Sequence, residues 1–592
     1  MPGRGDRGGK KEKPKDAKGT LLRILRYLAD YRLIVVFLCL LALLSNAGNL
    51  IGPKLAGSAI AEAEAGAGLV QFDRVFFYAK WMLIVYVGSN ILSFCVSLSM
   101  MWVSRHVAGK MRNDVFDKLM RLPVKYFDQN QAGDIISRVS YDIDVISTSL
   151  STDVVQILTS LVTVVGSFVM MVVISPPLVI CMLITIPMAI LFTRFMGRKT
   201  RPLYSRRSAA YGEMNGFVEE MFSGQKSILA YAYEDGVCDE FDVINHKAAD
   251  AYYEADRLGT STGPGVSFIS NLGLALIGLV GALLYYRNIV TLGQISSFVL
   301  YSRKFSGPIN EIANIINEIY SALAAAERVF RLLDEPEETA DVPDALVLSN
   351  AEGNVRMEQV SFGYLPGKTI LHNLELRADA GKTIAIVGPT GAGKTTIINL
   401  LMRFYDADSG QIFVDDHETR SITRDSLRKS YSMVLQDTWV FQGSIFDNIA
   451  YGKENATMEE VIEAAKAAHI HNYIMRLPQG YRTVIGEDGG NISKGQKQLL
   501  TIARAMLCDT RMLILDEATS NVDTNTEREV QKAMRNLMQG KTCFIIAHRL
   551  STIQNADKIL VVNQGDVVEQ GSHDELMKKR GFYYKLYESQ FE

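Results

Sequence analysis

Long apolar segments recur through the first half of the chain, and a mixed apolar and polar pattern replaces them in the second half. Runs of about 20 apolar residues are typical of helices that cross a lipid bilayer. Such runs occupy Leu33–Gly52, Met82–Met101, Val154–Ile174, Leu178–Thr193 and Val266–Tyr286. A further run, Ile289–Tyr301, is weaker because Arg303 and Lys304 follow it closely. We predict that it is a sixth span.

Basic residues are unevenly divided among the segments that connect these runs. The connections at 104–153 and 194–265 hold seven and nine Lys and Arg residues, whereas those at 53–75, 175–177 and 287–288 hold two, none and one. Connections rich in Lys and Arg remain on the cytosolic side of a membrane. The sequence therefore predicts that the two long connections are cytosolic.

Both long connections have a helical pattern with few turn signals, so we expect the spanning helices to continue beyond the bilayer. Each should bend once, near 126–134 and near 211–216. These bends are either contact points for another domain or ordinary solvated loops. No acidic residue lies in the middle of a clear span, which argues against a proton or ion relay and requires another energy source.

The second half contains a motif for binding nucleotide phosphates. Residues 383–387 (TIAIV) predict a buried strand, residues 388–396 (GPTGAGKTT) a loop, and the run from Ile397 a helix. This is the setting of a P-loop, whose backbone N–H groups and helix N-terminus hold phosphate. We expect Lys394 to reach the β and γ phosphates and Thr395 to ligate Mg²⁺. The other candidate ATP-binding residues of the loop are Gly388, Thr390, Gly391, Gly393 and Thr396.

Two further strands end in groups suited to phosphate chemistry. Residues 511–515 lead into Asp516 and Glu517, and residues 543–547 lead into His548. One carboxylate can hold Mg²⁺ while its neighbour polarises a water for in-line attack. His548 could contact a γ-phosphate. With a P-loop upstream, this interpretation is favoured over a structural charge pair.

Taken together, these motifs resemble those of ATP-binding-cassette (ABC) half-transporters of the exporter type, from about residue 20 to the end of the chain. The resemblance implies that Tyr364 stacks on adenine, that Gln436 senses Mg²⁺ and the membrane domain, and that Asp523 crosses a dimer interface. It also implies a Mg²⁺ role for Asp516 and catalytic roles for Glu517, Gln436 and His548. Residues 483–490 and 126–138 resemble segments that couple the two domains.

The signature loop of that family normally reads Leu-Ser-Gly-Gly-Gln, but here residues 492–496 read Ile-Ser-Lys-Gly-Gln. Ser493, Gly495 and Gln496 can still cap a partner's nucleotide. Lys494 adds a side chain, which would cost roughly 1–2 kcal/mol if this position requires a positive φ. We therefore predict a heterodimer with a second half-transporter, in which the site completed by Lys494 hydrolyses ATP slowly; a homodimer is the alternative.

The resulting fold prediction is a polytopic membrane domain of six transmembrane helices, followed by an α/β P-loop ATPase domain. We predict a basic disordered tail at 1–19, a transmembrane domain at 20–330, a linker at 331–350 and a nucleotide-binding domain at 351–592. The tail and the ATPase domain both belong in the cytosol, which requires an even number of spans. Without a targeting segment, the expected location is a bacterial plasma membrane.

The resemblance implies ATP-driven export of hydrophobic or amphipathic compounds, as in multidrug exporters. The alternatives are a lipid or peptide translocator driven by the same ATPase, an importer of exporter fold, and a tethered regulatory ATPase or gated channel. A net charge of −3 gives no indication of nucleic-acid binding. The six cysteines have no paired spacing, so we expect neither a disulfide nor a metal role for them.

Overall fold

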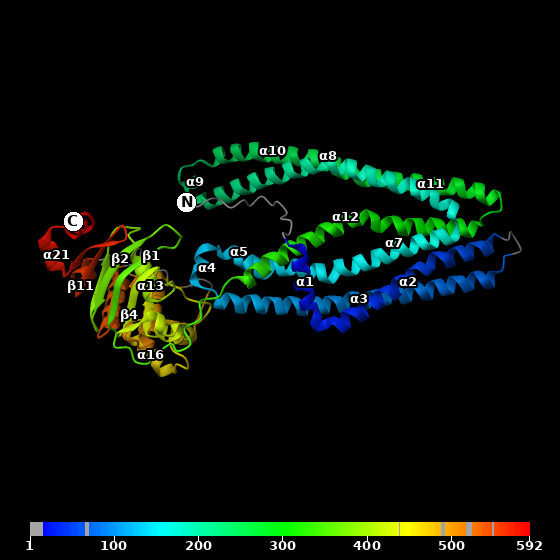
Figure 1. Cartoon of the computed structure of the whole chain (residues 1–592). Coiled ribbons are helices and arrows are strands. Elements are labelled where there is room, and N and C mark those ends of the chain that lie inside the picture. Colours follow the sequence, from blue (N-terminus) through cyan, green and yellow to red (C-terminus); the bar gives the residue numbers. More distant parts are fainter. Residues whose placement is uncertain are drawn as a thin grey trace. The chain divides into compact units, whose positions relative to one another are not determined.

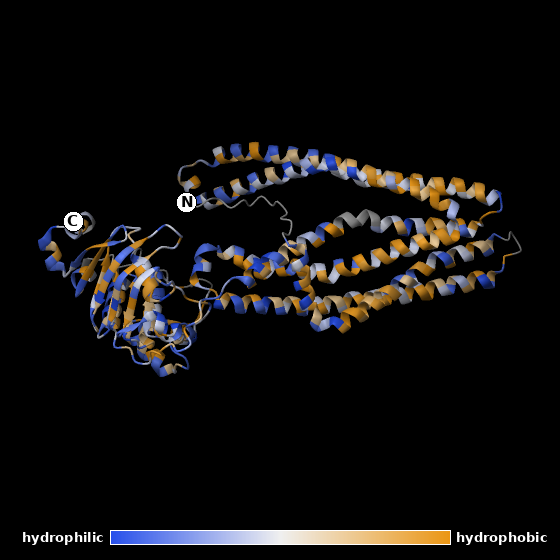
Figure 2. Cartoon of the chain, in the orientation of Figure 1, coloured by the Kyte–Doolittle hydropathy of each residue, from blue (hydrophilic) through white to orange (hydrophobic). Residues whose placement is uncertain are grey.

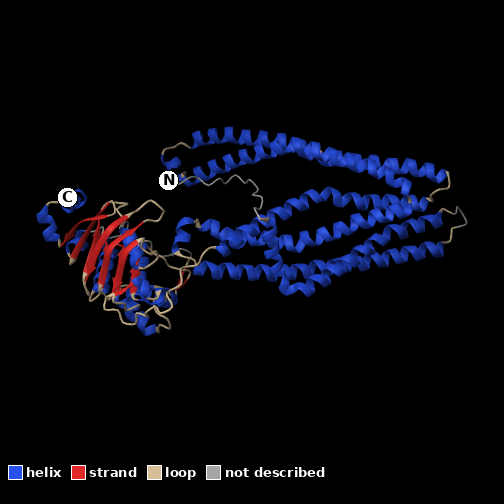
Figure 3. Cartoon of the chain, viewed as in Figure 1, coloured by secondary structure: helices blue, strands red, loops and turns tan. Residues whose placement is uncertain are grey.

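The computed structural model describes residues 16–64, 70–436, 438–486, 492–516, 524–547 and 550–591. The chain divides into two compact units. Unit 1 comprises Met1–Leu122 and Asn130–Glu335, and unit 2 comprises Pro123–Gln129 and Pro336–Glu592. Within the described residues, strands occur in unit 2, while unit 1 is helical (Figure 3).

Long helices build unit 1 (Figure 1). Several exceed 40 residues because the spans continue as helix into the hydrophilic connections, as predicted. The elements are α1 (Ala17–Leu28), α2 (Arg32–Ala63), α3 (Phe72–Arg121), α5 (Ala132–Ser137), α6 (Ile143–Thr148), α7 (Val154–Ile174), α8 (Pro176–Ser223), α9 (Gln225–Ala230), α10 (Glu234–Thr260), α11 (Thr262–Tyr286) and α12 (Leu292–Asp334). Short π-helical turns join α5, α6 and α7 into one continuous rod.

Five of the six predicted spans lie inside one of these helices. The span at Val154–Ile174 has the bounds of α7, and the others lie within α2, α3, α8 and α11. Apolar residues gather along one part of this helical unit, and hydrophilic residues increase toward α5, α9 and α10 (Figure 2). Among the described residues, five helical segments are long and apolar enough to cross a membrane. The weak sixth run, Ile289–Tyr301, is not one of them; only its residues 292–301 are helical, at the start of α12, which packs against α2 and α7.

One predicted bend is confirmed and the other is wrong. Near the first, α3 ends at Arg121 and the short helix α4 (Val124–Gln129) follows. Near the second, α8 continues unbroken through residues 211–216 and ends only at Ser223, before Gly224. A glycine inside a helix costs only about 0.5–1 kcal/mol relative to alanine, which the packing of α8 against α10 outweighs.

The partly buried lysine of α12, Lys304, has a structural explanation in the proline of α2. Pro53 has no N–H, so the carbonyl of Asn49, four residues earlier, loses its helical partner. Lys304 Nζ donates a hydrogen bond to this carbonyl at 2.6 Å, and Tyr301 Oη donates to the Leu50 carbonyl at 2.5 Å. A cation within a span is costly unless it is paired. Here it replaces the hydrogen bond that Pro53 removes.

Unit 2 contains two main sheets. The six-stranded sheet has the order β12-β11-β3-β10-β9-β6, and the four-stranded sheet has the order β2-β1-β4-β5. Parallel pairing joins β11, β3, β10, β9 and β6. The strands are β1 (Val355–Phe362), β2 (Leu371–Ala378), β3 (Thr383–Val387), β4 (Ser409–Val414), β5 (His417–Glu418), β6 (Tyr431–Val434), β7 (Gly443–Ser444), β8 (Val484–Ile485), β9 (Met512–Asp516), β10 (Thr542–Ile546), β11 (Lys558–Asn563) and β12 (Asp566–Gly571).

The parallel strands are buried on both faces, which explains why β3 reads as a continuous apolar run. Ile384 and Ile386 face a core that includes α13 (Lys394–Leu401), while Ala385 and Val387 face a second core that includes α18 (Lys494–Leu507). The remaining helices of unit 2 are α14 (Arg424–Lys429), α15 (Ile445–Ala450), α16 (Met458–Ala467), α17 (His471–Arg476), α19 (Thr524–Met538), α20 (Leu550–Gln554), α21 (His573–Lys579) and α22 (Phe582–Phe591).

Candidate functional site

The predicted phosphate-binding segments meet at one edge of the six-stranded sheet. Ile386 of β3 pairs with Ile546 of β10, which pairs with Asp516 of β9. The neighbouring strand β6 ends level with these, because Val434 pairs with Leu515. The P-loop follows β3 directly, so the register brings it to the same edge as Asp516 and the residues that follow β6. Ligand sites of open α/β sheets lie at this carboxyl edge.

The P-loop glycines are required by the shape of the loop. A Cβ on Gly388 would lie 2.0 Å from the carbonyl oxygen of Val562, and one on Gly393 would lie 2.8 Å from Leu371 Cδ2. Gly391 and Gly393 have φ of +83° and +103°, which L side chains rarely adopt. The loop is therefore a tight backbone cradle, and such a cradle suits a phosphate held by N–H groups at a helix N-terminus.

Lys394 lies across this cradle. Its Nζ donates hydrogen bonds to the carbonyls of Gly388 at 2.8 Å and Pro389 at 3.0 Å. Burial lowers the pKa of Lys394, and the nearby carboxylate of Asp516 partly opposes this effect. An ammonium group that is poorly solvated gains more from a phosphate than an exposed one would. Lys394 thus stands where the sequence predicts a phosphate-binding cation.

The hydroxyl and carboxylate groups predicted for Mg²⁺ have suitable surroundings. The Thr395 side chain is exposed at the first turn of α13, and Asp516 is half-buried at the end of β9. Gln436 is exposed just after β6. Oxygen ligands of these kinds are the ones Mg²⁺ prefers, so this donor set fits the ion. Thr390 is exposed in the loop, whereas Thr396 is buried.

Tyr364, predicted to contact adenine, lies beside the P-loop helix. Its hydroxyl donates to Thr396 Oγ1 at 3.3 Å and accepts from Asn399 Nδ2 at 2.9 Å. Its ring packs edge-on against Phe362 and Tyr405, with centroids 5.0 Å apart in each pair. These contacts place an aromatic ring next to the phosphate cradle, although Tyr364 and Gly388 are 24 positions apart in the sequence.

The signature segment forms the start of α18. Ser493 is its N-cap: Ser493 Oγ accepts from the Gln496 N–H at 3.3 Å, and the Ser493 N–H donates to Gln496 Oε1 at 2.9 Å. Lys494 is the first helical residue and is not among the described residues with positive φ. The strain considered for this lysine therefore does not arise. Its side chain is exposed, whereas Gly495 is buried.

Some predicted residues lie outside the described part of the chain. They are Glu517, Asp523 and His548. Of the predicted coupling segment at 483–490, the structure describes residues up to Gly486, where Val484 and Ile485 form β8 against β7. The sequence predictions for the three site residues stand as predictions.

Sequence reasoning missed the contact made by the first predicted coupling segment. Tyr405 Oη donates a hydrogen bond to Asp128 Oδ2 of α4 at 2.5 Å, and both residues belong to unit 2. Tyr405 follows the P-loop helix by four residues and packs on Tyr364. No spacing could reveal a pair that is 277 residues apart in the chain. The aromatic character of Tyr405 was the available signal.

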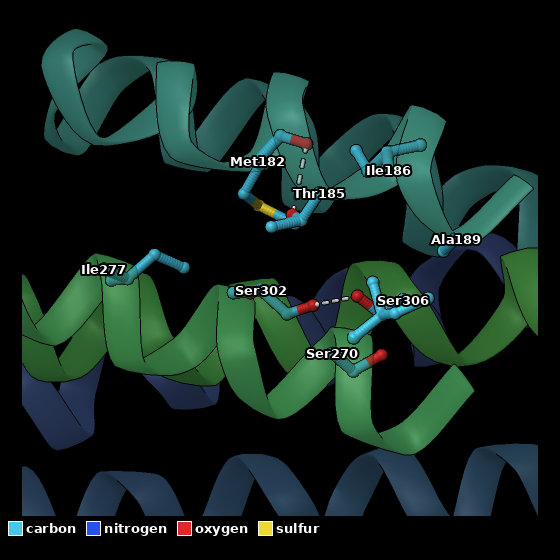
Figure 4. Close-up of a pocket in the computed structure, with 10 residues that line it drawn as sticks. Met182, Thr185, Ile186, Ala189, Ser270, Ile277, Ser302 and Ser306 are labelled. Carbon is cyan, nitrogen blue, oxygen red and sulfur yellow. Dashed lines mark hydrogen bonds between the residues drawn. The ribbon is translucent and has the colours of Figure 1, made fainter. Parts of the chain in front are cut away.

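Unit 1 contains a small cavity between α8, α11 and α12 (Figure 4). Its volume is about 40 Å³. Hydroxyl groups of Thr185, Ser270, Ser302 and Ser306 line it together with apolar side chains such as Met182 (Figure 4). Thr185 and Ser306 donate to carbonyls of their own helices, at 3.3 Å and 3.0 Å. The cavity thus offers polar oxygen atoms in an otherwise apolar part of the bundle.

A P-loop at the edge of a parallel sheet, in one chain with helices that can cross a membrane, defines a membrane-transport ATPase. The sequence matches the ABC transporter transmembrane region over residues 35–309 and the ABC transporter domain over residues 371–520. The chain belongs to the ABC transporter family, as a half-transporter of the exporter type with fused membrane and ATPase domains. It is a multi-pass membrane protein that binds and hydrolyses ATP to move substances across the membrane. The predicted fold class is confirmed.

Relatives with curated names span most of the chain. An uncharacterized ABC transporter ATP-binding protein of Bacillus subtilis, YfiC, is 41% identical over 98% of this chain and 96% of its own length. A fatty acid ABC transporter ATP-binding/permease protein of Mycobacterium bovis is 44% identical over 86% of this chain and 79% of that protein. An ATP-dependent lipid A-core flippase of Escherichia coli is 33% identical over 86% of this chain and 88% of that protein.

A solved structure has the same architecture. It is described as a bacterial Atm1-family ABC exporter with ATP bound. Its sequence is 28% identical, and the match covers 95% of this chain and 99% of that chain with a TM-score of 0.74. The assignment of this chain to exporters rather than to unrelated P-loop ATPases follows from this shared membrane domain.

Proposed function

We propose that this chain exports amphipathic compounds that combine a long apolar part with a compact polar group. The observation that carries the proposal is a pair of adjoining sites in unit 1. The hydroxyl-lined cavity shares Ile269 with an apolar groove of about 630 Å³ between α8 and α11. The groove is lined by Met188, Leu191, Phe192, Phe195, Gly265, Phe268 and Ile269. Serine and threonine hydroxyls would hold the polar group while the groove takes the apolar part.

The names of two relatives support a lipid-like substrate. One is called a fatty acid transporter and the other a lipid A-core flippase. An acyl chain matches the groove, whose wall combines aromatic rings and methionine, side chains that adapt to flexible apolar ligands. Compounds with a single acyl chain are therefore the first class to test. The wider range of a multidrug exporter is the second, because the same wall would accept other apolar shapes.

The ATPase cycle we propose uses two half-transporters. The P-loop of one chain, with Lys394, would hold ATP together with Ser493, Gly495 and Gln496 of the other chain. Mg²⁺, when held by Thr395, Asp516 and Gln436, supplies charge neutralisation on the phosphate oxygens. Glu517 would act as the base and His548 would contact the γ-phosphate. Closure of the two ATPase domains would then convert an inward-facing cavity into an outward-facing one, because ATP binds the closed state better.

We propose a heterodimer, and the reason is the chemistry of Lys494. A cation at the first position of α18 opposes the helix dipole, which costs about 0.3–1 kcal/mol, yet it attracts phosphate. This chain would then contribute an intact ATP-binding face and a modified signature to two unequal sites. Both the N-terminus and the ATPase domain would be cytosolic, in a bacterial plasma membrane.

Reconstitution tests transport directly. The chain, purified with any co-purifying half-transporter, is inserted into vesicles with a fluorescently labelled fatty acid, and flux is recorded with MgATP inside or outside. Export predicts ATP-dependent movement away from the ATPase side, which Lys394→Ala abolishes. Glu517→Gln should retain ATP but stop turnover. Flux toward the ATPase side, or flux that persists in Lys394→Ala, would contradict the proposal.

Subunit composition needs its own measurement. The chain alone should show slow ATP hydrolysis if its modified signature requires a partner. Lys494→Gly, which restores the family pattern, should then raise hydrolysis by the chain alone. Fast, cooperative hydrolysis by the unmodified chain would instead establish a competent homodimer.

A further inference from the structure

Unit 2 has a polar hollow on the outer face of its four-stranded sheet. Its volume is about 570 Å³, which lies in the range of small-molecule sites. The lining includes five charged residues, Arg356, Glu358, Glu375, Arg377 and Lys558. Apolar residues of β1 and β2 alternate with the charged ones and face the core, so the charges of both strands stand on the outer face. We call this feature the outer-sheet hollow.

The outer-sheet hollow is separate from the predicted nucleotide site. Lys558 begins β11 and pairs with Ile384, near the start of β3. The P-loop follows the opposite end of β3, after Val387. The strand rises roughly 10 Å between Ile384 and Val387, at about 3.3 Å per residue. A ligand in the hollow would therefore bind near the amino edge of the parallel strands, whereas the P-loop lies at their carboxyl edge.

Positive charges gather at one end of the hollow. Arg356 of β1 is directly opposite Arg377 of β2 in the antiparallel register. Lys558 Nζ donates a hydrogen bond to the Arg377 carbonyl at 3.4 Å, which brings a third cation to this end. Like charges directly opposite each other destabilise a pair of strands. An anion bound between the two guanidinium groups would relieve this repulsion.

Existing contacts position both guanidinium groups. The Arg356 guanidinium lies 4.8 Å from the centroid of the Phe413 ring, and its Nε is 2.8 Å from Glu358 Oε1. Arg377 Nε donates to Asp379 Oδ1 at 3.1 Å. Ion pairs between exposed side chains such as these contribute little to stability, so a ligand can compete with them. A carboxylate that binds the terminal nitrogens of an arginine can do so through two parallel hydrogen bonds.

Negative charges stand at the other end of the hollow. A β-bulge in β1 places Glu358 and Gln359 together opposite Glu375 of β2. Gln359 has a φ of +49°, which is uncommon for a residue other than glycine, and a Cβ on Gly410 would lie 2.3 Å from the Gln359 carbonyl oxygen. Bulges and residues in such conformations are enriched beside functional sites. Glu375 is exposed and forms no ion pair with any residue that the structure describes.

The outer-sheet hollow is therefore dipolar. Arg356 and Glu358 are two positions apart on β1, which is about 7 Å along a strand. The same spacing separates Glu375 from Arg377 on β2. Because the two strands are antiparallel, the arginines share one end and the glutamates share the other. A ligand that matches this pattern carries opposite charges at its two ends, several ångströms apart.

We propose that the outer-sheet hollow binds a small zwitterion whose carboxylate and ammonium groups are joined by a short flexible chain. The carboxylate would lie between Arg356 and Arg377, and the ammonium beside Glu358 and Glu375. Polar atoms of the chain would contact the side-chain amide of Gln411, which also lines the hollow. An ω-amino acid and a dipeptide both have this form. The proposal does not depend on the identity of the transported substrate.

Other charge patterns fit the hollow less well. A small inorganic anion would contact the arginines but leave Glu375 without a partner. An acidic peptide would bring its own carboxylates against Glu358 and Glu375, and like charges at close range repel. A zwitterion is the class of ligand that satisfies both ends.

Saturation-transfer NMR of the full-length protein in detergent tests the proposal with 5-aminopentanoate as the probe, and a titration gives its Kd. Glycine carries the same two charged groups side by side, so it cannot reach both ends and should bind at least about tenfold more weakly. Saturating MgATP should leave the Kd of 5-aminopentanoate unchanged, because the P-loop lies at the opposite edge of the strands. Higher salt should weaken binding, since both contacts are between charges near the surface.

Two variants and two singly charged probes resolve the ends of the hollow. Arg377→Gln should weaken 5-aminopentanoate about tenfold, and Glu375→Gln about fivefold, because each removes one charge-assisted contact. Arg377→Gln should also weaken pentanoate but not pentylamine, and Glu375→Gln should do the reverse. A general loss of structure would not produce this exchange. Arg535→Gln is the matched control: it removes an exposed arginine of α19 outside the hollow and should leave every Kd unchanged.

The outcomes decide the proposal. The charge-specific exchange, with an unaffected Arg535→Gln control, supports it. Absence of 5-aminopentanoate binding overturns it, and so does displacement of the probe by MgATP, which would place the probe in the nucleotide site. If Glu375→Gln leaves the Kd of 5-aminopentanoate unchanged, the hollow recognises anions alone and the zwitterion is the wrong class. Tighter binding of a hexaglutamate peptide than of 5-aminopentanoate would also overturn the proposal, in favour of an acidic protein partner.

Discussion

Gly388→Ala should lower the stability of the ATPase domain more than Gly391→Ala does. The added Cβ at Gly388 would lie 2.0 Å from the Val562 carbonyl oxygen, which belongs to the backbone of β11. That strand pairs with β3 immediately before the P-loop, so neither partner can move away independently. Overpacking typically lowers folding stability by about 1–3 kcal/mol. A clash with backbone, which cannot move aside, should cost about 3 kcal/mol.

Gly391 is the matched control. Its φ of +83° disfavours alanine, but an added Cβ would have no heavy atom within 4 Å. Only the backbone cost applies, about 1 kcal/mol. For a domain of this size, 1 kcal/mol corresponds to about 2–4 °C in melting temperature. Gly388→Ala should therefore lower the melting temperature of the ATPase domain by about 6–12 °C, and Gly391→Ala by about 2–4 °C.

Thermal unfolding of the full-length protein in detergent, followed by intrinsic fluorescence, measures both shifts. ATP affinity measured on the same samples reports the effect on the cradle. The proposed clash at Gly388 is refuted if Gly388→Ala has the same melting temperature as the unmodified protein. It is also refuted if Gly391→Ala lowers the melting temperature more than Gly388→Ala does. Equal shifts would show that backbone conformation, and not the contact with Val562, governs this loop.

Three further predictions concern side chains away from the P-loop. Arg328→Gln leaves the buried carboxylate of Asp142 without its ion-pair partner and should cost about 3 kcal/mol, measured by thermal unfolding. Burial works against ionisation of Asp557, but hydrogen bonds from Thr383 and Lys382 outweigh it and hold the pKa of this carboxyl below its usual value. The stabilising effect of the ionised Asp557 is complete at neutral pH and is lost as pH falls through that lowered pKa. Asp557→Asn should therefore reduce the melting temperature at about pH 7. The difference in melting temperature between this variant and the unmodified protein should narrow toward about pH 3. Ser444→Ala removes the N-cap of α15 and should cost about 1 kcal/mol in the same assay.

Local patterns predicted the elements whose physics is local. The apolar run Val154–Ile174 is helical, as predicted, because a run of about 20 apolar residues is long enough to cross the bilayer as a helix. The order of strand, glycine loop and helix at the P-loop is likewise confirmed, since its glycines serve the shape of the loop itself. Asp516 and the residues after β6 share an edge with the loop because parallel strands end together.

Features that depend on partners far along the chain could not be predicted. The bend expected at 211–216 is absent because packing against α10 outweighs the weak helix-breaking effect of two glycines. Lys304 weakens the prediction of a sixth span. The lysine is tolerated there because it donates to the Asn49 carbonyl, 255 residues away, whose helical partner is missing at Pro53. The conformation of Lys494 depended on where α18 begins, which a changed family motif does not reveal.

The two hydrogen bonds between Lys394 and its own loop oppose the binding of an anion by this lysine. Any incoming anion must compete with the Gly388 and Pro389 carbonyls for the same ammonium group. A small anion with a single site of charge exchanges one set of contacts for another and gains little. A polyphosphate chain also engages the surrounding backbone N–H groups, and only such a ligand profits from the exchange. We therefore expect the loop to bind a polyphosphate more tightly than inorganic phosphate.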